Sequence, residues 1–153
     1  MAREIAADVA KGGGLITAAD LAAYEVKERE PIRGTYRGYD VLSAPPPSSG
    51  GIALVEILNI LEGYDLAKAG NRSGESIHLT VEAFRRAFYD RAEFLGDPDF
   101  AKIPVAQLID KRYAAGWRET IDPMHGTWSC RTCQHFQFLS KNPAGKLRAG
   151  WHP

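Results

Sequence analysis

The sequence has few of the features that assign a chain to a class at once. Its 153 residues include only two cysteines, too few for a disulfide framework. No apolar run approaches the roughly 20 residues that cross a bilayer, and residues 1–8 are too polar for a signal peptide. A basic excess is also missing, because nineteen basic residues balance nineteen acidic ones. We therefore expect no membrane span, no export signal and no nucleic-acid partner.

Acidic residues are absent from the end of the chain. All nineteen lie between Glu4 and Asp122, and residues 124–153 hold four basic residues and no acid. Residues 1–123 hold the other fifteen basic residues, so an acidic body precedes a basic tail. The change falls at Asp122-Pro123, where proline favours the end of regular structure. We expect a partial domain over residues 1–123 and an unrelated, disordered tail over residues 124–153.

What the body does contain is apolar periodicity interrupted by turn residues. The pattern predicts helices over residues 2–11, 17–24, 52–61, 73–95 and 104–119. It predicts strands over residues 26–33 and 39–43, joined as a hairpin whose turn lies between Gly34 and Gly38. In the longest helix, Ile77, Val81, Phe84, Phe88 and Leu95 share one face. Glu82, Arg86 and Asp90 form i,i+4 pairs on a polar face.

Several short patterns in the body could carry chemistry, each beside a simpler structural interpretation. Ser48-Ser49-Gly50-Gly51 precedes a helix and could hold an anion on free backbone N–H groups, or could be a loop shaped by packing. His78 with Glu82 one turn later could be an acid–base pair, or His78 could be a histidine at the edge of the core. The simpler interpretation is favoured in both cases.

Charged groups flank the longest helix. Arg85, Arg86 and Arg91 could grip a carboxylate, or could be the polar flank of an amphipathic helix. Asp97 and Asp99 in Gly96-Asp97-Pro98-Asp99 could bind a cation, or could cap the helix end. The structural interpretation is again favoured for both.

The tail holds a set of soft metal ligands. His125, Cys130, Cys133 and His135 lie within eleven residues and could bind tetrahedral zinc. The spacing lacks a second ligand pair at the usual distance for a zinc finger. We therefore favour an incidental cluster in an unfolded tail.

The body resembles a known family along most of its length. The matching runs are Gly13 to Tyr24, Arg29 to Tyr39, Pro45 to Gly51, Leu58 to Asp65, His78, Glu82 to Arg91 and Leu95 to Phe100. In this order they resemble γ-glutamyltranspeptidase, also called glutathione hydrolase. The resemblance covers the C-terminal part of the large subunit and stops near Pro123.

The resemblance implies a fold and a chemistry for the complete enzyme. The fold would be the αββα sandwich of N-terminal-nucleophile hydrolases, of which this chain supplies an α+β fragment, mostly helical with one β-hairpin. In that family a precursor cleaves itself into two subunits. The new N-terminal threonine of the small subunit attacks a γ-glutamyl carbonyl, with its own α-amino group as base. The acyl group then passes to water, an amino acid or a peptide, usually in the periplasm or outside the cell.

No residue with a family role transfers to this chain. The γ-glutamyl-binding arginine of the family lies upstream, and the nucleophile and other glutamate-binding groups belong to the small subunit. Thr127 is the only threonine near the expected cleavage point, and Trp128-Ser129-Cys130 after it does not fit the Thr-Thr-His-like context. We expect no catalytic, cofactor-binding or metal-binding residue and no cofactor.

These observations predict a truncated γ-glutamyltranspeptidase-like protein that is inactive alone. Its partners would be the missing small subunit and, at the family level only, glutathione or other γ-glutamyl compounds. A fragment of a cephalosporin-acylase-like amidase and a noncatalytic binding module, zinc-stabilised by the tail, remain alternatives. We further expect uncovered apolar surface and self-association, because the absent parts would cover helix faces that include Leu54, Val81 and Phe84.

Overall fold

The computed structural model describes residues 1–127, which divide into a short N-terminal unit, residues 1–30, and a larger unit that begins at Pro31. The N-terminal unit holds helices α1 (Ala2–Lys11) and α2 (Ala18–Ala23), with no buried residue in either. Thr17 Oγ1 accepts a hydrogen bond from Asp20 N, and Asp20 Oδ2 accepts one from Thr17 N at 2.8 Å. This capping box confirms the predicted start of the second helix.

The larger unit begins with an antiparallel hairpin of β1 (Ile32–Tyr36) and β2 (Tyr39–Ser43), in which Ile32 faces Ser43 and Tyr36 faces Tyr39. Arg37 and Gly38 form the turn with φ of 50° and 86°, as a tight two-residue hairpin requires.

The prediction of a hairpin was right, but the prediction of its first strand was wrong. The strand starts after Pro31, which has no N–H to donate to a ladder, and it runs on through Gly34. Gly34 is not part of the turn. It lets the strand lie close to the helix beneath, because a Cβ there would lie 2.7 Å from Val55 Cγ1.

Five helices follow in the described part of this unit. They are α3 (Gly50–Leu61), α4 (Leu66–Ala69), α5 (Gly74–Phe94), α6 (Val105–Leu108) and α7 (Lys111–Glu119). Ser73 caps α5 as predicted, by accepting a hydrogen bond from Ser76 N at 3.0 Å. The single helix predicted over residues 104–119 is two helices, because the carboxylate of Asp110 accepts from the N–H groups of Arg112 and Tyr113 and starts α7.

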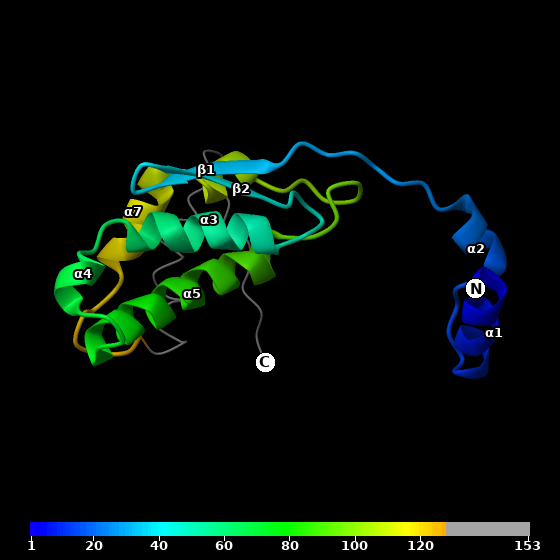
Figure 1. Cartoon of the computed structure of the whole chain (residues 1–153), viewed down its shortest axis with the longest axis horizontal. Coiled ribbons are helices and arrows are strands. Elements are labelled where there is room, and N and C mark those ends of the chain that lie inside the picture. The colour runs from blue at the N-terminus through cyan, green and yellow to red at the C-terminus, as the bar shows by residue number, and fades with distance from the viewer. Residues whose placement is uncertain (128–153) are drawn as a thin grey trace, which may run out of the picture. The chain divides into compact units, whose positions relative to one another are not determined.

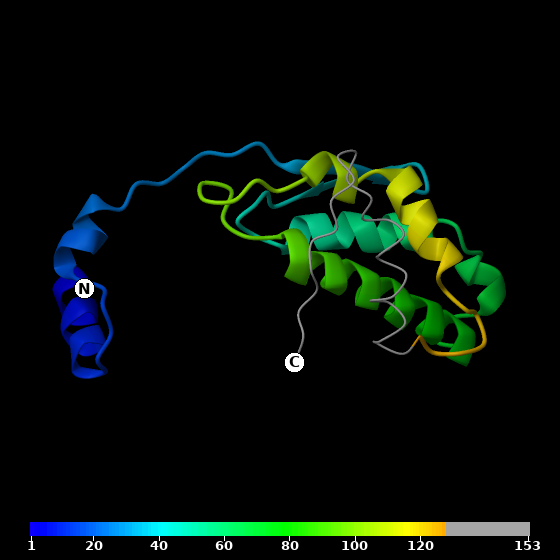
Figure 2. The same cartoon turned by 180° about the vertical axis from the view of Figure 1, so that it is seen from behind.

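Helix α3 lies at the centre of the larger unit, between the hairpin on one side and α5 on the other (Figures 1 and 2). One core cluster joins α3, α5 and α7 around Ile60, Ala83 and Trp117. A second joins the hairpin, α3 and α6 through Ile32, Ile52, Val55 and Leu108. The architecture is therefore α+β, mostly helical with one hairpin, as predicted.

The predicted orientation of α5 was wrong. Its buried residues are Leu79, Glu82, Ala83, Arg86, Ala87 and Asp90, whereas the face with Ile77, Val81, Phe84 and Phe88 is exposed. The small side chains of Ala83 and Ala87 let α5 approach α3 closely, and the charged side chains between them find partners inside the unit. Leu54, Val81 and Phe84 accordingly stay outside the core, with 43%, 49% and 45% of their surface exposed.

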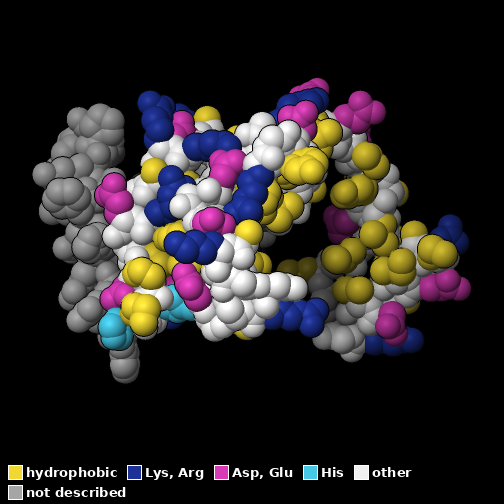
Figure 3. Space-filling model, turned by 60° about the vertical axis from the view of Figure 1, so that its left-hand side comes forward, with side chains coloured by type: hydrophobic (Ala, Val, Ile, Leu, Met, Phe, Trp, Pro, Cys, Tyr) yellow, Lys and Arg dark blue, Asp and Glu magenta, His cyan; other side chains and the backbone are white. Residues whose placement is uncertain are grey.

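On the face that Figure 3 shows, Lys and Arg side chains are interspersed with Asp and Glu rather than gathered by sign. Within residues 1–127, no helix combines the length and the apolar character that crossing a bilayer requires.

Candidate functional site

The loop that leads into α3 is shaped by a close contact. A Cβ on Gly51 would clash with the carbonyl oxygen of Ala44, so the glycine is required for packing. The Ser49 side chain does not cap its own helix. Its Oγ instead accepts a hydrogen bond from Arg91 Nε at 2.9 Å, which ties the loop to α5. These contacts support the favoured interpretation of Ser48 to Gly51 as a packed loop, and the alternative of anion binding there is untested.

His78 and Glu82 do not form an acid–base pair. His78 Nε2 lies 2.8 Å from the carbonyl oxygen of Asp122, and since a carbonyl only accepts, Nε2 carries the proton and donates it. Glu82 is buried and accepts hydrogen bonds from Arg86 and from the backbone N–H of Thr127. His78 is thus a helix-edge histidine that holds the chain after α7, and the acid–base hypothesis is wrong.

The most elaborate polar site in the described residues is centred on Arg86, whose side chain is fully buried. Its guanidinium donates to the Glu82 carboxylate and to the Glu82 carbonyl, the latter at 3.0 Å. It also donates to Thr120 Oγ1 and Thr120 O, both at 2.8 Å, and to Thr127 Oγ1 at 3.2 Å. Arg86 therefore joins α5 to the end of α7 and to the segment that follows.

Glu82 completes this site from the other side. Its Oε1 accepts from Thr127 N at 3.0 Å and lies 3.6 Å from Arg85 Nη1. Burial acts to raise the pKa of Glu82, but hydrogen bonds from Thr127 and Arg86 outweigh burial, and the pKa is lowered below its ordinary value. Glu82 is thus a stable anion that neutralises the buried guanidinium. We call Glu82, Arg86, Thr120 and Thr127 the arginine cluster.

The three arginines considered as an alternative carboxylate grip do not converge. Arg86 is saturated within the arginine cluster, Arg85 lies beside Glu82 on the surface side, and Arg91 bonds Ser49. The hypothesis of a shared carboxylate site is therefore wrong. The interpretation as a polar helix flank is also wrong for Arg86, whose side chain is fully buried.

Sequence reasoning missed a pair of buried carboxyl groups between α3 and α5. Glu56 and Asp90 are almost wholly buried, and Glu56 Oε1 and Asp90 Oδ1 have no other hydrogen-bond partner among the described residues, so a proton on one carboxyl serves both. Asp90 Oδ2 also accepts from Tyr113 OH at 2.8 Å and from Trp117 Nε1 at 2.9 Å. The one signal that could have found this pair is a lone acid in the otherwise apolar run from Ile52 to Leu58.

The pair shares a proton. Burial, then the hydrogen bond to Asp90 and its charge, raises the pKa of Glu56 from 4.5 to about 10. Burial likewise raises the pKa of Asp90, against the hydrogen bonds that it accepts from Glu56, Trp117 and Tyr113. At neutral pH Glu56 is therefore protonated and donates to Asp90, which needs no external cation.

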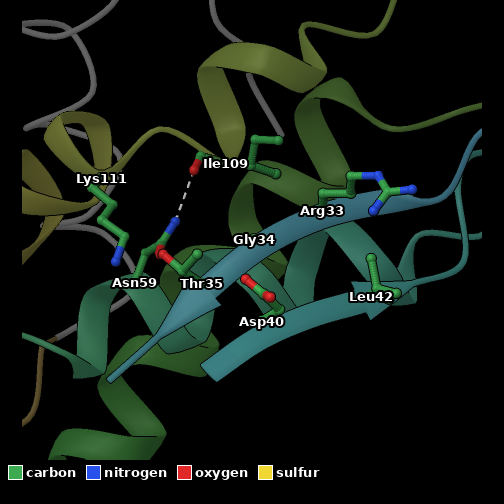
Figure 4. Close-up of a pocket in the computed structure, with 8 residues that line it drawn as sticks. All are labelled: Arg33, Gly34, Thr35, Asp40, Leu42, Asn59, Ile109 and Lys111. Atoms are coloured by element: carbon green, nitrogen blue, oxygen red, sulfur yellow. Dashed lines mark hydrogen bonds between the residues drawn. The ribbon is translucent and has the colours of Figure 1, made fainter. Parts of the chain in front are cut away.

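A shallow pocket of about 390 Å³ opens between the hairpin and the loop before α7 (Figure 4). Its lining residues are Arg33, Gly34, Thr35, Asp40, Leu42, Asn59, Ile109 and Lys111. Asn59 Nδ2 donates to the Ile109 carbonyl at 2.8 Å, and Lys111 pairs with Glu62. The lining offers both positively and negatively charged side chains. Within residues 1–127 it holds no nucleophilic side chain that is hydrogen-bonded to a base.

The two metal-binding hypotheses, neither of them the favoured interpretation, find no support in the described residues. Asp97 Oδ1 accepts from Asp99 N at 3.0 Å and closes a turn, as the structural interpretation expected. His125 Nδ1 lies 3.1 Å from Asp122 Oδ2 on the surface. Within residues 1–127 no three His, Cys, Asp or Glu side chains are grouped as a metal site. Cys130, Cys133 and His135 lie outside the described residues, and both the favoured incidental cluster and the zinc hypothesis stay untested there.

Comparison with known proteins agrees with the resemblance in the sequence. Residues 1–145 match the family model described as gamma-glutamyltranspeptidase. The chain is 52% identical over 122 residues to the glutathione hydrolase proenzyme of Escherichia coli (strain K12), covering 80% of this chain and 21% of that relative. It is 53% identical over 114 residues to the acylase ACY 1 proenzyme of Pseudomonas sp. (strain SE83), covering 74% and 20%.

A solved structure supports the same assignment. The gamma-glutamyltranspeptidase of Helicobacter pylori superposes with a TM-score of 0.78 at 46% identity, over 85% of this chain and 37% of that one. The chain thus spans about a fifth of the length of the curated relatives it matches, which are named as proenzymes. Since the family model covers most of the chain and the fold agrees, the chain belongs to the gamma-glutamyltranspeptidase family.

Proposed function

We propose that the chain is a scaffold segment of an enzyme that hydrolyses glutathione and transfers γ-glutamyl groups, and that it has no turnover alone. The observation that carries this proposal is the 52% identity over 122 residues to a glutathione hydrolase proenzyme of which the chain spans 21%. The complete enzyme would act on glutathione or other γ-glutamyl compounds, and a small subunit would supply the nucleophilic threonine. An acyl amide is the alternative substrate class, because acylase proenzymes are equally similar.

The buried polar groups support a scaffold role. The arginine cluster is saturated by its own members, and the carboxyl groups of Glu56 and Asp90 bond each other. Both sites are buried inside the larger unit, away from solvent. As a domain assignment, we take residues 1–123 as the family segment and residues 124–153 as a tail. The start of this tail is tied to the segment, because Thr127 bonds Arg86 and Glu82, and the family model extends to residue 145.

A chimeric enzyme tests the proposal. Residues of this chain replace the matching 122-residue segment of the Escherichia coli proenzyme. The chimera is expected to mature and to release the chromophore from a γ-glutamyl anilide, whereas the purified chain alone releases none above background. A chimera that folds but does not turn over would contradict the scaffold role, as would turnover by the chain alone that survives Thr127→Ala.

The same chimera separates the two substrate classes. Turnover of the γ-glutamyl anilide but not of a glutaryl amide, which lacks the α-amino group, places the segment with the glutathione hydrolases. The reverse preference would favour the acylase alternative. The isolated chain is also proposed to self-associate, because it leaves large apolar side chains exposed.

A further inference from the structure

The segment that follows α7 contacts α5 at the peptide bond between Asp122 and Pro123. The carbonyl oxygen of that bond accepts a hydrogen bond from His78 Nε2 at 2.8 Å. Asp122 and Pro123 are both exposed, so water reaches the bond. The same bond divides the acidic body of the sequence from its basic tail. We call His78, Asp122 and Pro123 the Asp-Pro site.

The carboxylate of Asp122 is an internal nucleophile for this bond. Its Oδ1 accepts from Met124 N at 2.8 Å and from His125 N at 3.2 Å, and Oδ2 lies 3.1 Å from His125 Nδ1. These contacts, that of Met124 above all, hold the pKa of Asp122 below its ordinary value. The carboxylate therefore stays ionised in mildly acidic solution. Only Cα and Cβ separate it from its own carbonyl carbon, so attack closes a five-membered ring.

The other two requirements for cleavage are met by Pro123 and His78. The nitrogen of Pro123 belongs to a tertiary amide, which takes up a proton more readily than an ordinary peptide nitrogen and leaves more easily. The N–H of His78 already points at the oxygen on which negative charge develops when the carbonyl carbon is attacked. A nucleophile, an oxyanion donor and a leaving group therefore meet at one exposed bond.

We propose that the chain cleaves itself between Asp122 and Pro123, by attack of the Asp122 carboxylate on its own carbonyl carbon with His78 as the oxyanion donor. A C–O bond forms, the C–N bond to Pro123 breaks, and the departing nitrogen takes a proton from the acidic solvent. The resulting cyclic anhydride is opened by one water molecule, which gives the side-chain carboxyl and a new C-terminal carboxyl. The net reaction is the hydrolysis of one peptide bond. The inference does not rest on the proposed function, because the chain itself holds every group that reacts with the bond.

The second Asp-Pro bond of the sequence, between Asp97 and Pro98, is an internal standard. Its carbonyl oxygen accepts from the backbone N–H groups of Phe100 at 3.0 Å and Ala101 at 2.8 Å. His78 lies in the first turns of α5, whereas this bond follows the end of the helix. Replacing His78 should therefore change cleavage at one Asp-Pro bond and not at the other.

Incubation of the full chain in mildly acidic buffer, followed by mass spectrometry, measures both cleavages in one sample. The products are denatured before measurement, because Thr127 beyond the cut bonds the arginine cluster. The native chain should yield residues 1–122 and 123–153, at a rate that is independent of protein concentration. Circular dichroism of the same sample shows that the helices are intact during incubation.

His78→Leu tests the role of the histidine. In the native chain it should lower the ratio of cleavage at Asp122–Pro123 to cleavage at Asp97–Pro98 at least about tenfold, because the oxyanion loses its donor. In urea, where the contact between His78 and Asp122 is lost, the same substitution should leave the ratio unchanged. The unfolded chain thus provides the matched control for the folded one.

Two substitutions of Asp122 test the nucleophile without altering α5. Asp122→Asn removes the carboxylate and should reduce cleavage at this bond to background. Asp122→Glu keeps the charge but requires a six-membered ring, and it should slow cleavage at least about tenfold.

Three outcomes would overturn the proposal. They are a cleavage ratio in the native chain that His78→Leu leaves unchanged, cleavage that survives Asp122→Asn, and native Asp122–Pro123 that is cut no faster than in urea. If His78→Leu fails to fold, the comparison of the native with the unfolded chain and the two Asp122 variants still decide. The chimeric enzyme tests the proposed function separately, so either proposal can fail without the other.

Discussion

Glu56 lies on α3 between Val55 and Ile57, with 1% of its surface exposed. Its protonated carboxyl donates to Asp90, and its pKa is raised to about 10. In the unfolded chain the same group ionises near 4.5. Between these values, unfolding releases a proton. The stabilisation from Glu56 is therefore complete below the unfolded pKa and is lost as pH rises toward the folded one.

Glu56→Gln should remove this pH dependence. Glutamine keeps a donor for Asp90 but has no proton to release, so the variant should gain stability relative to the native chain as pH rises. The difference in unfolding free energy should grow by on the order of 1 kcal/mol for each pH unit between 5 and 8, as measured by urea denaturation. Glu56→Leu should flatten the dependence equally but be less stable than Glu56→Gln, since Asp90 loses a donor. A difference that is constant with pH would contradict the shared proton.

Arg86 presents the opposite case, a buried charge with a full set of partners. Arg86→Met should cost about 3–5 kcal/mol in urea denaturation, because it leaves the Glu82 carboxylate buried without its cation. Arg85→Met is the matched control one residue away. Arg85 is partly exposed and 3.6 Å from the same carboxylate, so its loss should cost less than about 1 kcal/mol. Equal costs for the two variants would show that the arginine cluster is not the stabilising site.

Among the elements, those fixed by local chemistry are the ones that the sequence predicted well. The starts of α2 and α5 follow from Thr17 and Ser73, whose side chains bond N–H groups three residues ahead. The division of α6 from α7 was missed although Asp110 is an equally local cap. The first strand was predicted too early in the chain. Its start is set by the strand with which it pairs and not by its own composition.

The face that α5 buries could not be predicted from periodicity. The apolar residues of α5 follow helical spacing, but the buried side is set by distant partners. Ala83 and Ala87 lie against α3, and Arg86 bonds Thr120, thirty-four residues away. A hydrophobic pattern cannot distinguish a core face from a docking face, and here the more apolar face is the exposed one.

The close contact between Gly51 at the start of α3 and Ala44 in the loop before it predicts the effect of a substitution on stability. Gly51→Ala should destabilise the larger unit by roughly 2–4 kcal/mol, because the added methyl group clashes with the rigid carbonyl of Ala44. Gly74→Ala in the first turn of α5 is the control, since nothing lies within 4 Å of the position its Cβ would take. Thermal melts of both variants provide the measurement. A Gly51→Ala protein as stable as Gly74→Ala would show that the loop is free to move aside.

At the scale of the whole molecule, the family and fold were predicted from the order of many matching runs, none of which was sufficient alone. For the candidate site, the sequence predicted mainly which catalytic and binding residues would be missing. The acid–base pair and the arginine grip failed because the groups involved are used inside the unit, which a linear sequence does not reveal. The Glu56–Asp90 pair forms only when α3 packs against α5. The only local sign of it in the sequence is one isolated acid in an apolar helix.

The division into two units predicts where a protease enters. Residues 24–31 form no regular secondary structure, and Lys27 is exposed. Within residues 1–127, trypsin should therefore cut first after Lys27, and mass spectrometry should find a product that begins at Glu28. Lys27→Gln should slow this cleavage and shift it to Arg29. Earlier cleavage at Arg85 or Arg91 would show that α5 opens more readily than the segment between the units.

The central place of α3 has a consequence for synthesis of the chain on the ribosome. The hairpin and α3 emerge together, but α3 contacts α5, α6 and α7 as well, and those helices are translated later. Until they arrive, Ile57, Ile60 and Leu61 have no cover from the helices that later bury them. The nascent chain therefore passes through an interval in which its most apolar helix is a substrate for chaperones, and that interval ends only when α7 is complete.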